Sequence, residues 1–209
     1  MARYTGAVCR LCRRDGVKLF LKGSRCFSEK CAIDKRNFPP GQHGQARAKK
    51  IVGYGLQLRE KQKAKRFYFT LESQFRKYYE KASTKTGVTG DLLIQQLERR
   101  LDATCYRVGF ALSRRQARQL VRHGHVLVNG KKVNIPSYQL KVGDVLEVRE
   151  SAKKFDIVEG ASQFHAGLQQ PSWLQIDREA RTAKLLSLPN RQEIQLPVNE
   201  QLIVELYSK

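Results

Sequence analysis

The sequence RRLDATCYRVGFALSRRQARQLVRHGHVLVNGKKVNIPSYQLKVGDVLEV, residues 99–148, decides the fold of this chain. It contains a helix start, because Ser113 is a favourable N-cap residue and Gln116 stands three residues later, as a capping box requires. Gly124 suits the position after a helix end, where the left-handed backbone is common. We therefore predict a helix over residues 114–123.

The same stretch continues with β structure. Residues 126–128 and 131–135 flank Asn129-Gly130, the strongest short signal for a β-hairpin. Residues 140–148 supply one more strand around the turn at Gly143-Asp144. The stretch thus predicts a small unit of helix and antiparallel strands.

The predicted helix carries two stripes. Its apolar face is formed by Ala117, Leu120 and Val121. Arginines recur every fourth residue beside that face, at Arg114, Arg118 and Arg122. Such a stripe is often only a solvated helix face, but residues 113–143 contain no Asp or Glu, whereas merely soluble surfaces intersperse both signs. We therefore favour a nucleic-acid contact, with the guanidinium groups holding phosphates.

The stretch resembles the RNA-binding domain named after ribosomal protein S4. The matching positions are Arg100, Leu101, Asp102, Gly109, Ser113, Arg114, Ala117, Arg118, Leu120, His123, Gly124, Asn129, Gly130, Pro136, Ser137, Gly143 and Asp144. This domain also occurs in some synthetases and pseudouridine synthases, so by itself the resemblance implies only the binding of structured RNA.

Charge and length narrow the function further. A chain of 209 residues can form one or two domains with a core, and its net charge of +21 implies a polyanionic partner. The charge is +10 over residues 1–50, +6 over 51–90 and +5 over 91–150, but zero over 151–209. No apolar run approaches a membrane span and no signal-peptide core begins the chain, so we expect a cytoplasmic protein without a membrane partner.

Four cysteines near the N-terminus have the spacing of a metal site. Cys9 and Cys12 are separated by two residues, and Cys26 and Cys31 follow with four residues between them. Four thiolates can surround one tetrahedral zinc ion; two disulfides or four buried thiols are the alternatives. We predict one structural Zn²⁺ and expect the neighbouring cations to lower the pKa of the thiols. Cys105 stands alone and is expected in the core.

The middle of the chain is basic and then helical. Residues 34–50 are rich in Pro, Gly and Lys, which predicts an extended linker that orders along RNA. Within this linker, we expect His43 to be a turn residue or an RNA contact rather than a zinc ligand. Residues 56–82 have helical periodicity, with Leu71 and Phe75 assigned to the core. A further helix is predicted from Asp91 to Leu101.

The last quarter predicts short strands. We expect them at residues 173–176, 184–188 and 193–196, separated by turn residues. The apolar end, residues 202–207, is expected to pack back on the N-terminal helices.

Further segments extend the resemblance over the whole chain. The opening MARYTG, the turn PGQHG at 40–44, GLQLREKQK at 55–63 and the ending LIVELYSK at 202–209 are similar to the bacterial small-subunit ribosomal protein S4 family, in its four-cysteine, zinc-bearing form. This resemblance implies a structural constituent of the small subunit that binds the 5′ domain of 16S rRNA, nucleates assembly and contributes to translational accuracy. It also implies contacts with ribosomal protein S5 and with mRNA where it enters the ribosome.

The predicted fold is α+β. Residues 1–45 form a zinc-binding segment and basic linker, 46–98 a helical rRNA-binding domain, and 99–198 an RNA-binding module with antiparallel strands. Residues 199–209 pack back on the helical domain.

The predicted RNA contacts rest on charge density in the N-terminal half and on helix geometry in the module. They are Arg3, Arg10, Arg13, Arg14, Lys22, Lys49, Lys50, Arg59, Lys63, Arg100, Ser113, Arg114, Arg115, Arg118, Arg122, His123 and Lys131.

Two other classes of protein fit the sequence less well. An RNA-modifying enzyme needs a catalytic domain, but the last quarter is short and Asp156, Asp177 and Glu193 have no obvious catalytic partners. A zinc-dependent DNA-binding regulator needs a dimerisation heptad or an effector domain, and the sequence offers neither. We therefore predict no enzymatic activity and no catalytic residues.

Overall fold

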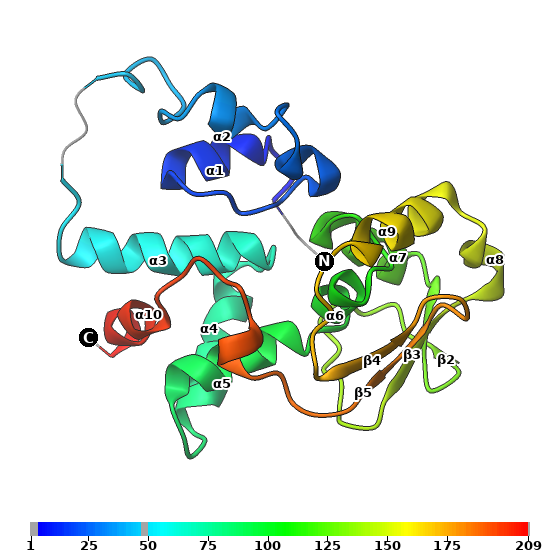
Figure 1. The fold of residues 1–209 in the computed structure, drawn as a ribbon. Helices are drawn as coiled ribbons and strands as arrows, with labels where there is room; N and C mark the ends of the chain where they lie inside the picture. Colours follow the sequence, from blue (N-terminus) through cyan, green and yellow to red (C-terminus); the bar gives the residue numbers. More distant parts are fainter. Residues whose placement is uncertain (1–3, 47–49, 209) are drawn as a thin grey trace. The chain divides into compact units, whose positions relative to one another are not determined.

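The computed structural model describes residues 4–46 and 50–208. The chain divides into two units: residues 1–94 together with 196–209, and residues 95–195. The first unit is helical and the second combines helices with one antiparallel sheet, so the α+β prediction is correct (Figure 1).

The first unit begins with short elements around the cysteines. These are α1 (Cys9–Asp15), η1 (Gly23–Phe27) and α2 (Ala32–Lys35). Leu19, Leu21 and Ile33 are buried in this segment. The longer helices α3 (Tyr54–Phe67) and α4 (Glu72–Ser83) follow.

The helical stretch predicted over residues 56–82 is two helices. It breaks at Tyr68–Leu71, where Phe69 has a left-handed φ of 51° and Tyr68 is buried. Burial of two successive aromatic rings favours the turn over a continued helix. The assignment of Phe75 to the core is confirmed, whereas Leu71 precedes α4 and is 39% exposed, so that assignment was wrong.

The C-terminal helix α10 (Glu200–Tyr207) packs alongside α3 (Figure 1). The Gln57 amide donates a hydrogen bond of 3.0 Å to Glu205, and the Asn199 N–H donates one of 3.0 Å to Glu60. Tyr207 stacks on Tyr79 with 4.5 Å between ring centroids. The apolar end of the chain therefore closes the helical unit.

The second unit consists of a helical part and a sheet. Helix α5 (Thr89–Glu98) leads into it, followed by α6 (Leu101–Val108), α7 (Arg114–Arg122), α8 (Glu150–Lys153) and α9 (Asp156–Ala166). The predicted helix start is confirmed, because the Ser113 hydroxyl accepts the Gln116 N–H at 3.3 Å. The helix predicted from Asp91 to Leu101 ends at Glu98, and Leu101 begins α6.

The sheet has the strand order β2-β1-β3-β5-β4 and is antiparallel throughout. Its strands are β1 (Val126–Val128), β2 (Lys131–Lys132), β3 (Val145–Val148), β4 (Leu174–Asp177) and β5 (Thr182–Leu185). Asn129 and Gly130 both have positive φ, as a type I′ hairpin turn requires, so the predicted hairpin is confirmed.

One face of this sheet forms the core with the helices. Val126, Val128, Leu146 and Leu185 alternate inward and pack with Ala117, Val121 and Trp173. The apolar face predicted for α7 is thus confirmed. Cys105 is also fully buried in this core, as expected.

The last predicted strand, 193–196, was wrong. Residues Arg191–Glu193 form the 3₁₀-helix η2 instead. Asn190 caps it, since its side chain accepts the Gln192 N–H at 3.4 Å. Among the described residues, no helix is both long and apolar enough to cross a membrane.

Candidate nucleic-acid interface

The arginines of α7 point in different directions. Arg114 and Arg118 are only 6% and 3% exposed, whereas Arg122 is exposed and Arg115 is half-buried. The guanidinium stripe that the spacing predicts therefore turns inward over its first two members and outward at its end.

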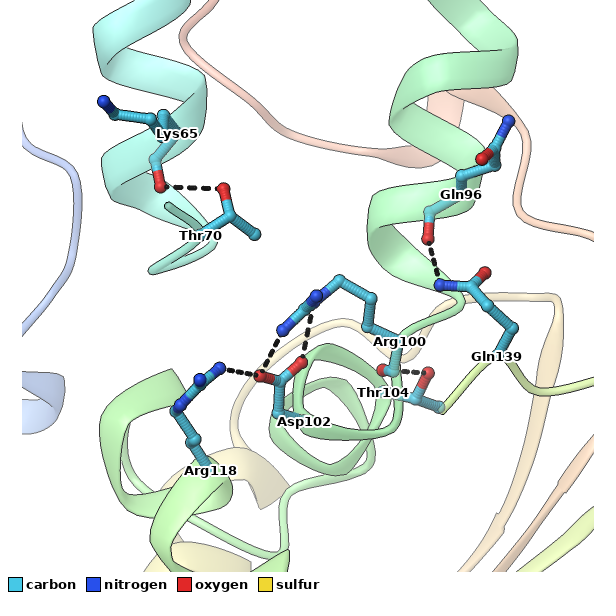
Figure 2. Close-up of polar contacts among 8 residues, drawn as sticks. All are labelled: Lys65, Thr70, Gln96, Arg100, Asp102, Thr104, Arg118 and Gln139. Atoms are coloured by element: carbon cyan, nitrogen blue, oxygen red, sulfur yellow. Dashed lines mark hydrogen bonds and ion pairs between the residues drawn. The ribbon is translucent and has the colours of Figure 1, made fainter. Parts of the chain in front are cut away.

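Asp102 in α6 is the partner that draws Arg118 inward. Its carboxylate accepts hydrogen bonds of 3.0 and 2.8 Å from Arg100, and one of 3.0 Å from Arg118. Figure 2 shows both guanidinium groups converging on this carboxylate. Arg100 is fully buried and Asp102 is 4% exposed, so two guanidinium groups share one carboxylate away from water.

Glu98, the last residue of α5, forms a second buried acidic centre. The Arg107 guanidinium donates to both of its carboxylate oxygens, at 3.0 and 2.7 Å. Arg114 approaches the same carboxylate at 3.7 Å and lies 4.4 Å from the centroid of the Tyr106 ring. Arg114 is therefore held by a carboxylate and an aromatic face together.

These contacts correct the interpretation of the stripe. Arg100, Arg114 and Arg118 were predicted to hold phosphates, but in this structure their guanidinium groups are buried structural groups. The absence of acidic residues from 113–143 was misleading, because the balancing carboxylates come from α5 and α6, earlier in the chain. Ser113 is likewise buried, and its hydroxyl caps α7.

Some predicted contacts in the first unit also have internal partners. Arg59 lies 3.5 Å from Asp15, whose fully buried side chain also accepts a 2.7 Å contact from Arg66. Lys63 pairs with Glu60 one helical turn away. Arg13 donates to the Phe38 carbonyl at 3.0 Å, which ties α1 to the start of the basic linker.

Apart from the half-buried Arg115, the remaining predicted contacts within the described residues are open to solvent. Exposed side chains are those of Arg10, Arg14, Lys22, Lys50, Arg122, His123 and Lys131. Arg3 and Lys49 lie outside the described residues. The exposed groups occur in both units, so each unit presents positive charge to a polyanion.

The sequence reasoning left out several exposed cations, among them Lys132 and Arg149. Lys132 follows Lys131 in β2, and Arg149 follows β3. Lys132 could have been found from the hairpin, because the turn at Asn129-Gly130 fixes its position opposite Leu127. Arg149 gave no such signal, since its position depends on how the chain leaves β3.

The four N-terminal cysteines are free thiols, which excludes the disulfide alternative in this structure. Burial raises the pKa of Cys12 to about 11, and charges on Cys26, Cys9 and Cys31 raise it further. Burial also raises the pKa of Cys26, whose sulfur accepts the Lys22 N–H at 3.4 Å. The expected lowering of the pKa is therefore wrong for these two thiols.

The donor set fits zinc chemically, since four sulfurs from one short segment influence one another and two of them accept backbone N–H groups. Over residues 4–46 and 50–208, no group of three or more His, Cys, Asp or Glu is arranged to hold a metal ion.

Comparison with known proteins gives results over the whole chain. The family model described as ribosomal protein S4/S9 N-terminal domain matches residues 3–98, and the S4 domain model matches residues 99–146. The chain is 68% identical to a small ribosomal subunit protein uS4 from Acidobacterium capsulatum, over the full length of both. Proteins of the same name from Koribacter versatilis and Solibacter usitatus are 64% and 60% identical, again over their full lengths.

Proposed function

This chain belongs to the family of small ribosomal subunit protein uS4, and we propose that it binds 16S rRNA as a structural constituent of the small ribosomal subunit. Its family is one of ribosomal structural proteins, not of enzymes. The observation that carries the proposal is identity of 60–68% over the entire chain, covering both units and not only the RNA-binding module.

The charge distribution supports RNA as the ligand. Exposed cations in both units can neutralise phosphates where rRNA helices meet, and each contact releases counterions. The major groove of A-form RNA is too narrow for side chains, so junction shape and 2′-hydroxyl groups supply the selectivity. The buried ion pairs have a different role: they fix α5, α6 and α7 to one another, which holds Arg115, Arg122 and His123 at defined positions.

The finer assignments are also proposed. The RNA site is the 5′ domain of 16S rRNA, where binding nucleates assembly of the subunit body and contributes to translational accuracy. Further partners are ribosomal protein S5 and mRNA where it enters the ribosome, and the protein works on cytoplasmic ribosomes. These assignments rest on family membership.

We also propose one structural zinc ion, held by Cys9, Cys12, Cys26 and Cys31. Zinc would cross-link the short elements of the N-terminal segment, with no open coordination position for catalysis. The support is chemical: four reduced thiols in one small segment, three of them buried.

Co-sedimentation tests the ribosomal assignment. A tagged chain, expressed in a bacterium and followed through a sucrose gradient, should migrate with the small subunit and remain there after a high-salt wash. A chain that remains at the top of the gradient, or that leaves all ribosomal fractions on washing, would refute the assignment.

A further inference from the structure

Two histidines and two cations meet at one surface of the second unit. His123 caps the end of α7, His125 precedes β1, Lys132 lies in β2 and Arg149 follows β3. The exposed Phe155 precedes α9. We call these five side chains the histidine surface.

The contacts within the histidine surface are close. The rings of His123 and His125 have centroids 6.0 Å apart, and Phe155 meets His125 edge-on at 5.2 Å. The backbone N–H of Arg149 donates to the backbone carbonyl of His125 at 2.9 Å, which holds the backbones of these two residues together.

Gly124 allows Lys132 to join the group. A Cβ at Gly124 would lie 2.1 Å from Cε of Lys132 and 3.0 Å from its Nζ, so the lysine side chain passes directly over this glycine. Lys132 and Arg149 both remain exposed, and neither pairs with a carboxylate in the described part of the chain. Glu150, the nearest acid in sequence, pairs instead with Lys153.

We propose that the histidine surface binds an RNA phosphate and takes up a proton from solvent as it does so. The site rests on the proposed function, since it assigns rRNA as the source of the phosphate. Lys132 and Arg149 supply permanent charge, His123 an exposed imidazole, and Phe155 an exposed aromatic edge beside them.

The electrostatics give the direction of the pH effect. Burial lowers the pKa of His125, and the charges of His123, Arg149 and Lys132 lower it further. Its Nδ1 is buried without a hydrogen-bond partner among the described residues, which also disfavours the doubly protonated ring. A phosphate offsets the cations and raises the pKa, so the bound state holds more protons and RNA affinity rises as the pH falls.

The test measures binding of the full-length protein to a 16S 5′-domain transcript at constant ionic strength between pH 5.5 and 7.5. A rise of one unit in the pKa of one histidine on binding can increase the RNA affinity at low pH by at most about tenfold. For the natural sequence we therefore expect the affinity at pH 5.5 to be about fivefold higher than at pH 7.5. The double variant His123→Gln/His125→Gln should show less than about twofold. His43→Gln changes another exposed histidine in the other unit, and should keep the full gain.

Two measurements keep the result interpretable if the double variant is unstable. Lys132→Gln/Arg149→Gln replaces only exposed side chains and should lower the salt slope of log affinity by about one to two, one unit for each lost phosphate contact. NMR titration of the intact protein should show the imidazole pKa of His125 rising when RNA is added.

The outcomes separate this inference from the proposed function. A strong preference for the 5′ domain with a flat pH profile, or with the same profile in the double variant, would overturn the histidine surface and leave the ribosomal function intact. No preference for the 5′ domain at any pH would overturn both.

Discussion

Replacing Asp102 by asparagine should destabilise the second unit strongly. The carboxylate accepts three hydrogen bonds from Arg100 and Arg118, and all three residues are at most 4% exposed. Asparagine keeps the shape but removes the charge, and its amide group also directs N–H donors toward guanidinium groups that have only donors themselves. Two buried cations then lose the carboxylate that they share.

Removal of one partner from a buried ion pair costs about 3–5 kcal/mol, because the other charge stays in a poorly solvating environment. Here one carboxylate serves two guanidinium groups, so the free energy of unfolding of this unit should fall by at least about 3 kcal/mol. At about 4 °C for each kcal/mol, the lower end for a domain of about 100 residues, its Tm should fall by at least about 12 °C.

Urea unfolding followed by circular dichroism and by Trp173 fluorescence measures this change, since Trp173 is buried in the core of the second unit. Asp156→Asn is the matched control: the same chemical change at an exposed position in the first turn of α9 should cost less than about 1 kcal/mol. Equal stability of the two variants would refute the buried ion-pair account. So would an Arg118→Ala effect that is undiminished in the Asp102→Asn background, because coupled partners cannot be additive.

Three further predictions follow from the same structure. Arg122 is exposed, so Arg122→Ala should weaken rRNA binding and reduce the salt slope of log affinity by about one without changing Tm. Arg118 is buried in an ion pair, so Arg118→Ala should chiefly lower Tm. Filter binding and thermal melting measure the two effects, and the reverse pattern would contradict the assignment of Arg122 to the surface and Arg118 to the interior. Burial opposes ionisation of Glu72, but hydrogen bonds from Lys61, Lys65 and Tyr207 outweigh it and lower its pKa to about 2. The stabilisation by the Glu72 carboxylate is therefore complete above its usual pKa of 4.5 and is lost as the pH falls from there toward 2. In Glu72→Gln, the free energy of unfolding should therefore depend less on pH in that window. The same pH dependence in denaturant titrations of the variant and the natural sequence would argue against this network. Native mass spectrometry should find one zinc ion per chain. The ion should be lost on addition of a chelator and in Cys12→Ser, but kept in Cys105→Ala. A natural protein that is folded and reduced but binds no metal would exclude the zinc site.

Local patterns in the sequence were reliable where short-range chemistry decides the structure. Ser113 was identified as the cap of α7 because its hydroxyl needs only the N–H three residues later. Asn129-Gly130 specified the hairpin because both residues tolerate positive φ. The apolar face of α7 followed from helical spacing alone.

Long-range pairing set the limits of prediction. Helical spacing puts Arg114, Arg118 and Arg122 on one side of α7, but it cannot show that Asp102 and Glu98 bury the first two. The break at Phe69 was missed for a related reason, since a run of aromatic residues has no breaker and turns only when its rings find a core. Sequence therefore located the RNA-binding module, while the structure was needed to separate its internal charges from its surface charges.

The central claim is that this chain recognises small-subunit rRNA, and competition binding tests it most directly. Labelled 16S 5′-domain transcript is bound by the full-length protein and challenged with an unrelated structured RNA of equal length, over a range of salt concentrations. The account predicts that affinity falls with salt on both RNAs while the preference for the 5′ domain persists at high salt. Equal affinity for both RNAs at every salt concentration would contradict the claim, because the protein would then bind polyanions in general through its net charge of +21.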